Sequence, residues 1–370
     1  MATVFKQGDA GSVCYCTLGC VMTKNGDVLV FCEARISPKD YDAHHLVYKR
    51  SVDDGRTWQP LEYFEFSANG ECYMNPVPLV DPASGRLFVL YALADFSAST
   101  QLFIRHSDDH GITWSERTDL TRLFIDDPHH RAYHLPGPGH GITLDSGRLL
   151  VSVWHRHGMR WMPTAGDRED SIFEFDVPEA ERGYGISMLY SDDGGSTWNT
   201  SEYLAIQDIG GNPFKMSEAR IVALRGGQIL AFTRGCAFIK DGASCHLKSF
   251  SEDEGETWSA PVYDTAIHPP YFCDSGLVSY PGGNLLLSRP ASGDMRRREL
   301  ALYISKDSSH TWHREMIIDP DDAGYSDILV LPNGGILVFY AGNYYNGFFG
   351  KDLCFQLIHR SALEHAVHSQ

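Results

Sequence analysis

An eight-residue pattern occurs five times in this 370-residue chain and limits its possible folds more than any other feature. The pattern reads S-x-D-x-G-x-T-W, and its copies end at Trp58, Trp114, Trp198, Trp258 and Trp312. The last copy has Ser309 in place of the glycine. The aspartate can accept hydrogen bonds from backbone amides, the glycine can take a positive φ, and the tryptophan can pin the turn to a sheet. Five copies in one frame predict a repeat architecture.

Each unit also contains an apolar run that follows a glycine-containing turn. Six such runs begin at Gly26, Gly85, Gly147, Gly227, Gly283 and Gly335. Most tryptophans of the pattern are about 55 to 60 residues apart, which fits four short strands per unit. The sequence therefore predicts an all-β fold, a six-bladed β-propeller in which residues 1–370 form one domain. The last blade has no copy of the pattern, so we expect an N-terminal strand around residues 3–6 to complete it.

The charge balance bears on the partners of the protein. The formal net charge is −17, with 21% charged and 43% hydrophobic residues, as in an ordinary soluble globular protein. An acidic surface argues against nucleic acid and anionic membranes as partners, because both attract basic faces. A small anionic substrate stays possible, since a local group of arginines can override the global field.

The cysteines and the N-terminus indicate the compartment. The nine cysteines are irregularly spaced, and Cys14, Cys16 and Cys20 fall close together without a zinc-binding pattern. We expect reduced, buried cysteines and no metal or cofactor. No apolar run has the length of a signal peptide or a membrane span. These features favour a cytoplasmic protein, or a secreted one if a signal peptide has been removed.

One spacing is longer than the others. The tryptophans Trp114 and Trp198 are 84 positions apart, and the excess falls in residues 155–185, which are rich in histidine, arginine, tryptophan and acidic residues. Two interpretations stay open. The segment is either a solvated insertion or a loop over the mouth of a pocket that selects substrates.

The eight-residue pattern is the Asp box, and the chain resembles the sialidase (neuraminidase) superfamily. Asp boxes lie on the outside of that fold and also occur in proteins that are not sialidases, so they bear on the fold and not on the function. Other stretches resemble the family in chain order and cover nearly the whole chain. They are residues 32–40, 74–78, 137–142, 217–220 with 233–235, 288–292 with 296–298, and 323–327.

The resemblance implies a role for several residues. Asp40 takes the place of the acid/base, with Asp42 as the fallback, Tyr325 that of the nucleophile and Glu218 that of its base. The arginines that bind the substrate's acidic group are Arg35, Arg234 and Arg297.

The chemistry explains this set. Sialic acids carry a carboxylate on the anomeric carbon, so a neutral tyrosine avoids the repulsion that a carboxylate nucleophile would meet. A tyrosine with a pKa near ~10 needs a base to take its proton. Arginine forks bind carboxylates with charge-assisted bonds. Taken alone, Tyr325 or Glu218 fits a structural role and the basic run a solvated turn, but their common order favours a glycosidase site.

One position departs from the family pattern. The resemblance implies an arginine on the first inner strand, where this chain has Cys16. Losing that contact would weaken binding of a carboxylate by a few kcal/mol, on the order of one charge-assisted pair. Another cation, such as Arg289, His44, His45 or a residue of the insertion, could compensate.

The function expected from these residues is that of a retaining exo-glycosidase of sialidase type. It would release terminal sialic acid, or a related 2-keto-3-deoxy sugar acid, from glycans. Two alternatives stay open. The pocket could serve a different glycoside, or the protein could bind carbohydrate without turnover, although Asp40, Glu218 and Tyr325 together argue against a pure lectin.

Overall fold

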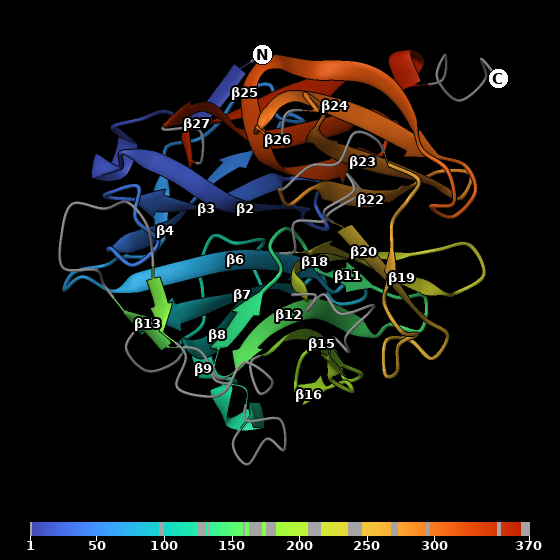
Figure 1. The fold of residues 1–370 in the computed structure, drawn as a ribbon. Coiled ribbons are helices and arrows are strands. Elements are labelled where there is room, and N and C mark those ends of the chain that lie inside the picture. Colours follow the sequence, from blue (N-terminus) through green and yellow to red (C-terminus); the bar gives the residue numbers. More distant parts are fainter. Residues whose placement is uncertain are drawn as a thin grey trace.

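The chain folds almost entirely into antiparallel β-sheet (Figure 1). The computed structural model describes residues 2–95, 100–124, 131, 133–157, 160–162, 172–174, 183–205, 216–235, 246–267, 273–293, 296–345 and 349–363. The short 3-10 turns within these ranges are η1 (Asp9–Gly11) and η2 (Thr121–Phe124). None of the helical segments in the described ranges is both long enough and apolar enough to cross a membrane.

The described strands form six blades. The strands follow sequence order from the inside outward, except that β1 is the outermost strand of the sixth blade. The first blade contains β2 (Cys14–Met22), β3 (Val28–Arg35), β4 (His44–Ser51) and β5 (Glu62–Glu65). The second blade contains β6 (Cys72–Val80), β7 (Leu87–Ala94), β8 (Thr100–Ser107) and β9 (Thr118–Asp119). The third blade contains β10 (Tyr133–Pro136), β12 (Leu149–His157), β15 (Gly183–Ser191) and β16 (Asn199–Thr200), flanked by β11 (Ile142–Thr143) and β17 (Leu204–Ala205).

The other three blades complete the ring. The fourth blade contains β18 (Met216–Ala223), β19 (Ile229–Gly235), β20 (His246–Ser251) and β21 (Val262–Tyr263). The fifth blade contains β22 (Gly276–Tyr280), β23 (Asn284–Pro290), β24 (Arg298–Ser305) and the first part of β25 (His313–Val330). The sixth blade contains the second part of β25, β26 (Ile336–Tyr345), β27 (Phe349–Ile358) and β1 (Ala2–Phe5). The long strand β25 thus belongs to two blades, because it pairs first with β24 and then with β26.

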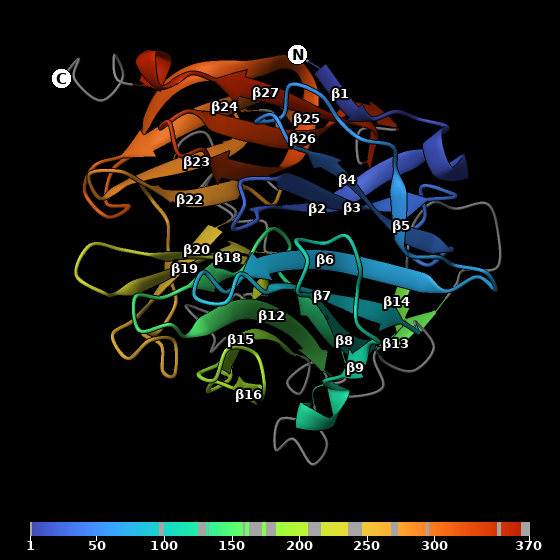
Figure 2. The ribbon, with the colours of Figure 1, turned by 180° about the vertical axis from the view of Figure 1, so that it is seen from behind.

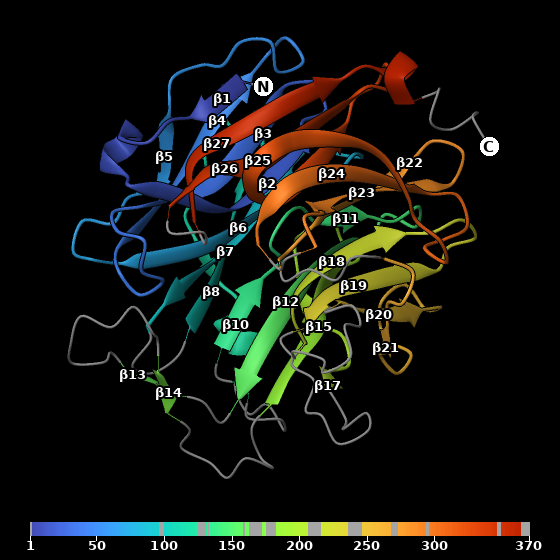
Figure 3. The same cartoon turned by 45° about the horizontal axis from the view of Figure 1, so that its top comes forward.

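The inner strands close into a ring around the axis. Strand β2 contacts β6 and β25, β22 contacts β25 and β18, and the third blade contacts β6 and β18 through β10 and β11. The C-terminal blade therefore lies beside the first blade, as the adjacent red and blue strands in Figure 3 show. This arrangement confirms the predicted six-bladed propeller, and all six glycine-led apolar runs form the second strands of their blades.

The N-terminal strand completes the last blade, as the sequence predicts. Strand β1 pairs antiparallel with β27, and Ala2 lies opposite Phe355 (Figure 2). An Asp box joins the third and fourth strands of each of the first five blades. The sixth blade lacks a box because its fourth strand comes from the other end of the chain, and no turn links the two.

The Asp box is held by a short network of hydrogen bonds. In the first copy, Asp53 Oδ1 accepts from the Thr57 amide and from the Ser51 hydroxyl, each at 2.8 Å. The Thr57 hydroxyl donates to Asp53 Oδ2 at 2.6 Å, and the Gly55 amide donates to the Ser51 hydroxyl at 2.8 Å. Gly55 has a φ of 81°. Ser309, which replaces this glycine in the last copy, adopts the same left-handed region with a φ of 73°.

Each box also joins its blade to the preceding one. The box tryptophans lie edge-on to aromatic rings in the second strand of the blade before, at centroid distances of 5.7 to 5.9 Å, in the pairs Trp58–Phe339, Trp114–Phe31 and Trp198–Phe88. The tryptophan therefore pins the turn to the neighbouring sheet and not to its own. Such burial of apolar side chains, about 1.5–3 kcal/mol each, makes the boxes part of the core between blades.

The long insertion is only partly described. Strands β13 (Arg160–Met162) and β14 (Ile172–Glu174) pair with each other and form a separate two-stranded sheet. The rest of residues 155–185 that could reach a pocket mouth lies largely outside the described residues. Its role as a substrate-selecting loop therefore stays a prediction.

Candidate active site

Tyr325, Glu218 and Arg234 come from three strands and meet in one hydrogen-bonded group. The Tyr325 hydroxyl donates to Glu218 Oε1. An Arg234 terminal nitrogen donates to Glu218 Oε2 at 2.6 Å and to the Tyr325 hydroxyl at 2.8 Å. Tyr325 lies on β25, Glu218 on β18 and Arg234 on β19. Residues that are 91 to 107 positions apart in the sequence are thus brought into direct contact.

The electrostatics of this group suit a nucleophile that stays neutral until it reacts. Burial and the Glu218 carboxylate raise the pKa of Tyr325 well above its ordinary value, although Arg234 and Arg297 act in the opposite direction. The phenol is therefore protonated near neutral pH and needs its neighbour to take the proton. Glu218 is placed to do so, because its Oε1 already accepts the hydrogen bond of the hydroxyl.

Arg297 and Tyr344 lie against Tyr325. The guanidinium carbon of Arg297 is 5.0 Å from the centroid of the Tyr325 ring, within the range of a cation–π contact. The Tyr325 amide donates to the Tyr344 hydroxyl at 3.3 Å. Gly324 allows this approach, because a Cβ at that position would lie 1.8 Å from the Tyr344 hydroxyl oxygen.

Arg35 and Asp40 form the part of the site that the first blade supplies. Arg35 Nε and one terminal nitrogen donate to Glu33 Oε2 at 2.9 and 2.5 Å, and the other terminal nitrogen donates to Asp40 Oδ1 at 2.5 Å. The Arg35 side chain is 2% exposed, whereas that of Asp40 is 52% exposed. Arg35 is thus fixed from behind by Glu33, while Asp40 stands at the solvent edge, where an acid/base group has to meet a leaving group. Asp42, the fallback acid, accepts from the Ser37 hydroxyl.

Cys16 lies between the two parts of the site. It is buried on β2, and the charges of Arg35, Glu33 and Arg297 all act on its thiol. Burial is the largest influence, and it raises the pKa of Cys16 well above the usual value of a thiol. A small, uncharged side chain therefore occupies the position at which the resemblance implies an arginine.

Histidines do not supply a replacement cation. His44 is fully buried, and burial together with the charge of Arg35 lowers its pKa to about 3. Burial also lowers the pKa of His45, whose Nδ1 accepts from the Ser67 amide at 3.0 Å. Both shifts favour a neutral ring at pH 7, which gives no support to His44 or His45 as the cation that compensates for Cys16.

Arg289 is enclosed inside the fifth blade. Its side chain has no exposed surface, and its terminal nitrogens donate to the Pro290 carbonyl and to the Tyr303 hydroxyl, both at 2.9 Å. The guanidinium carbon lies 4.6 Å from the centroid of the Tyr303 ring. This position inside the fifth blade gives no support to Arg289 as a substrate-binding residue.

A polar hollow of about 650 Å³ shares one lining residue, Tyr344, with the contacts around Tyr325. Neither the candidate catalytic residues nor the arginines described above line it, and most of its other side chains are charged or carry amides. Its lining comprises Lys6, Gln7, Arg298, Pro320, Asp321, Asp322, Asn343, Tyr344, Lys351 and Asp352. This lining offers both hydrogen-bond donors and acceptors, which suits the hydroxyl groups of a sugar.

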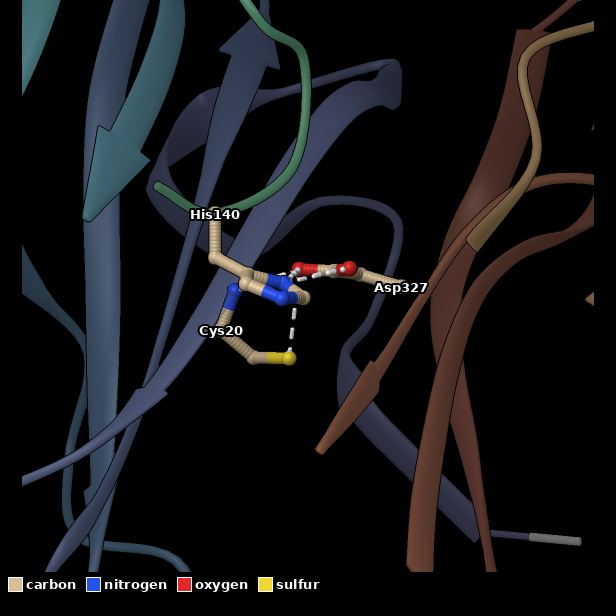
Figure 4. A group of neighbouring side chains, drawn as sticks. All are labelled: Cys20, His140 and Asp327. Carbon is tan, nitrogen blue, oxygen red and sulfur yellow. Dashed lines mark hydrogen bonds and ion pairs between the residues drawn. The ribbon is translucent and has the colours of Figure 1, made fainter. Parts of the chain in front are cut away.

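One group within the described residues has the composition of a metal site. The ligand atoms of Cys20, His140 and Asp327 lie within 4.8 Å of one another near the propeller axis (Figure 4). The Asp327 carboxylate, however, already faces His140 Nδ1 at 2.9 Å and accepts from an Arg220 terminal nitrogen at 3.1 Å and the Cys20 amide at 3.0 Å. A carboxylate has about four lone-pair sites, and a guanidinium beside it repels a cation, so this group does not fit a metal.

The thiols in the described ranges are buried and free of disulfides, as expected from the sequence. They are Cys14, Cys16, Cys20, Cys32, Cys72, Cys273 and Cys354. Burial raises the pKa of Cys14 and of Cys273 to about 11, so neither is a thiolate near neutral pH.

Sequence reasoning missed Glu33 and Tyr344. Glu33 is wholly buried, and its other oxygen accepts from the Asn75 amide at 2.9 Å, so it anchors Arg35 to the second blade. Glu33 and Arg35 are two residues apart on β3, and alternate residues of a strand point to the same side. That spacing was the available signal for Glu33. Tyr344 had no such signal, because its contact with Tyr325 depends on how two distant strand ends meet.

Comparisons with known proteins identify the family of the chain. A family profile described as "BNR repeat-like domain" matches residues 64–338. Sialidase-3 of Bos taurus is 27% identical over 367 residues, which cover 83% of this chain and 80% of that protein. A sialidase of Bacteroides fragilis is 24% identical over 367 residues, covering 90% of this chain and 61% of that protein.

Solved structures show the same fold. "Hadza microbial sialidase Hz136" superposes with a TM-score of 0.75 at 22% identity, covering 97% of this chain and 68% of that chain. The intramolecular trans-sialidase from Ruminococcus gnavus superposes with a TM-score of 0.74 at 16% identity and covers 98% of both chains. The chain belongs to the BNR repeat-like domain family, within the sialidase superfamily of glycoside hydrolases.

Proposed function

We propose that this protein is a retaining exo-glycosidase that releases terminal sialic acid, or a related 2-keto-3-deoxy sugar acid, from glycans. One observation carries the proposal. The Tyr325 hydroxyl donates to Glu218 while Arg234 donates to both of them. A buried tyrosine with its own base and an adjacent cation is the arrangement that nucleophilic attack on a carbon bearing a carboxylate requires.

The first step forms a covalent intermediate. The Tyr325 oxygen attacks the anomeric carbon as its proton passes to Glu218, and the bond from that carbon to the leaving oxygen breaks. Asp40 gives its proton to the leaving oxygen. The solvent-facing position of Asp40 suits this role, since the rest of the glycan has to depart through the opening.

The second step reverses the roles of the acid and the base. Asp40 takes a proton from water, the water oxygen bonds to the anomeric carbon, and the bond to Tyr325 breaks as Glu218 returns its proton. Two displacements at the same carbon retain its configuration.

The arginines hold the acidic group of the sugar during both steps. Arg234 and Arg297 flank Tyr325, and Arg35 approaches from the first blade. A ligand carboxylate that bound Arg35 would compete with Asp40 for the same guanidinium. Binding of substrate would thus release Asp40 toward the leaving oxygen. The polar hollow beside Tyr344 offers space for another part of the glycan.

Hydrolysis of a fluorogenic sialoside tests the proposal, with a panel of other aryl glycosides beside it. Tyr325→Phe should lower turnover at least about 10³-fold, because the nucleophilic oxygen is gone. Tyr280→Phe is the matched control, since its hydroxyl donates to the Gly334 carbonyl, away from the site. Unchanged turnover by Tyr325→Phe would overturn the proposed mechanism.

A second function has one observation in its favour. Cys16 leaves the site without one cation, so the pocket could accept a glycoside whose acidic group differs from that of sialic acid. Release from another glycoside in the panel, abolished by Tyr325→Phe, would support this alternative. Binding of a sialoside without turnover by the wild-type protein would instead support a carbohydrate-binding propeller.

A further inference from the structure

The two strands that carry Tyr325 and Glu218 make a second contact, two residues further along each strand, between Arg220 and Asp327. Glu218 and Arg220 are two residues apart on β18, and Tyr325 and Asp327 are two residues apart on β25. All four side chains are buried, and the contacts between them show that each strand presents its pair to the other strand. Glu218 meets Tyr325, and an Arg220 terminal nitrogen meets Asp327 Oδ1 at 3.1 Å.

Asp327 is anchored by several blades at once. It is fully buried, and it accepts from the Cys20 amide of the first blade at 3.0 Å (Figure 4). It also accepts from Arg220 of the fourth blade. His140, on the loop that follows β10, places Nδ1 2.9 Å from Asp327 Oδ1. Burial opposes the charge, yet His140 and Arg220 outweigh it and hold the pKa of Asp327 below its usual value. The carboxylate is therefore ionised and fixed.

Arg220 is anchored just as firmly. One terminal nitrogen donates to Asp274 Oδ2 at 2.5 Å and to the Ser326 carbonyl at 2.7 Å. Together with its ion pair to Asp327, Arg220 thus holds the two residues that follow Tyr325 on β25. Gly139 gives the guanidinium its room, because a Cβ there would lie 1.2 Å from an Arg220 terminal nitrogen. Within the stretch of residues 137–142, Gly139 is thus the position that leaves space for this arginine.

We propose that Asp327 and Arg220 are positioning residues that hold the Tyr325 hydroxyl against Glu218. This inference rests on the proposed function, in which Tyr325 attacks and Glu218 takes its proton. Asp327 lies on β25 and Arg220 on β18, so their ion pair joins the two strands two residues from Tyr325 and Glu218. It therefore sets the distance between the strands beside the reacting atoms. A displacement of about 1 Å from a reactive geometry can cost roughly 10²-fold in rate.

The kinetic test compares Asp327→Asn with a matched buried ion pair in the fourth blade. Lys248 Nζ lies 2.8 Å from Asp264 Oδ1, and Asp264 is also buried. Asp327→Asn should lower kcat by about 10- to 100-fold with KM changed less than about threefold, because the arginines that bind substrate are untouched. Asp264→Asn should change the melting temperature but leave kcat within about twofold.

Conservative replacement separates positioning from simple packing. Arg220→Lys keeps the charge and should retain more kcat than Arg220→Gln, by about threefold or more. If Asp327→Asn does not fold, His140→Gln replaces it in the comparison, since His140 is partly exposed and the substitution is milder. His140→Gln should lower kcat by about 3- to 10-fold.

A measurement without substrate keeps the inference distinct from the proposed function. 3-Fluorotyrosine is placed at position 325 and its ¹⁹F resonance is recorded. Asp327→Asn should shift or broaden this resonance, and Asp264→Asn should not. If Asp327→Asn shifts the ¹⁹F resonance but the wild-type protein hydrolyses no glycoside, the proposed function is contradicted and the positioning of Tyr325 is supported.

Three results would overturn the inference. The first is an unchanged ¹⁹F resonance in Asp327→Asn. The second is a loss of kcat in Asp264→Asn as large as that in Asp327→Asn. The third is an activity that a chelator removes and added zinc restores, which would make Cys20, His140 and Asp327 metal ligands.

Discussion

The two ends of each blade follow different rules. The Asp boxes begin where the third strand ends, and they repeat one set of hydrogen bonds, such as Ser51 and Thr57 to Asp53, with nearly the same lengths in all five copies. The catalytic candidates lie at the opposite end, where Arg35 is the last residue of β3. There the candidates come from several blades and differ from one another, and Tyr325 and Glu218 each occur once.

This difference separates what holds the fold from what performs the chemistry. A repeated turn can be built from the same residues five times because it solves the same packing problem against each neighbouring blade. A reaction centre needs unlike groups in one place, so it draws single residues from several blades. Changes at the boxes should therefore alter stability and leave turnover intact, whereas changes at the site should do the reverse.

After the loss expected for Tyr325→Phe, the next largest effect on turnover is expected at Asp40. Asp40→Asn should lower turnover of a natural glycan by about 10²- to 10³-fold, because a general acid contributes that much when the leaving group is poor. An aryl sialoside with a good leaving group should lose far less in its first step, since it needs no proton. Steady-state kinetics on both substrates, with the melting temperature as a check of the fold, makes the measurement.

Asp42→Asn is the control for that experiment. Asp42 lies two positions after Asp40, and its carboxylate accepts a hydrogen bond from the Ser37 hydroxyl. The substitution should change turnover by less than about threefold. A stronger dependence on the leaving group in Asp42→Asn than in Asp40→Asn would make Asp42 the acid.

The next effect concerns stability at the opposite end of the blades. Gly195 has a φ of 82°, and a Cβ there would lie 2.1 Å from Phe88 Cζ in the neighbouring blade. Gly195→Ala should lower the free energy of unfolding by about 2–4 kcal/mol, through backbone strain plus overpacking, and leave kcat per folded molecule unchanged. Thermal or denaturant unfolding measures the loss.

Gly226→Ala separates the strain from the packing. Gly226 has a φ of 93°, but a Cβ there would meet nothing within 4 Å. We expect a loss of about 1–2 kcal/mol from strain alone. Equal losses in the two variants would mean that contact between a box and the blade before it contributes nothing.

The same contrast explains how far the sequence could be interpreted. The six blades and the N-terminal closing strand followed from repeats, because turn geometry and strand alternation depend on residues close together in the chain. Tyr325, Glu218 and Arg234 could be placed by their resemblance to a family. Their shared hydrogen bonds could not, since they depend on the rotation between blades.

The burial of individual charged and titratable side chains could not be predicted from the sequence. His44 and His45 looked like available cations, yet both are buried and neutral at pH 7. Arg289 looked like a substitute arginine, but its guanidinium is enclosed beside Tyr303. A charge can be counted in a sequence, but its protonation and its exposure depend on the neighbours that the fold supplies.

A smaller effect is expected at Cys16, which lies between the two parts of the candidate site. Cys16→Ala should change kcat/KM by less than about threefold, because burial raises the pKa of the thiol and keeps it unreactive. The cavity left by the sulfur should lower stability by about 1 kcal/mol. Loss of turnover after Cys16→Ala, or after alkylation with iodoacetamide that this variant resists, would give Cys16 a chemical role.

The smallest effect should come from one box carboxylate, and it depends on pH. Hydrogen bonds from the Thr57 hydroxyl, the Thr57 amide and the Ser51 hydroxyl lower the pKa of Asp53 to about 2. Its value in the unfolded chain is ~4, so the folded state favours the ionised form. That contribution to stability is complete above about pH 4 and is lost as the pH falls toward about 2.

Asp53→Asn should therefore lower the melting temperature slightly at pH 7, and the gap to the wild-type protein should narrow below about pH 4. Asp54→Asn, at the adjacent position with a surface pair to Arg56 at 3.9 Å, is the control and should behave like the wild-type protein. A gap for Asp53→Asn that stays constant down to about pH 2 would mean that the shape of the turn, and not the charge of its aspartate, stabilises the outer end of the blade.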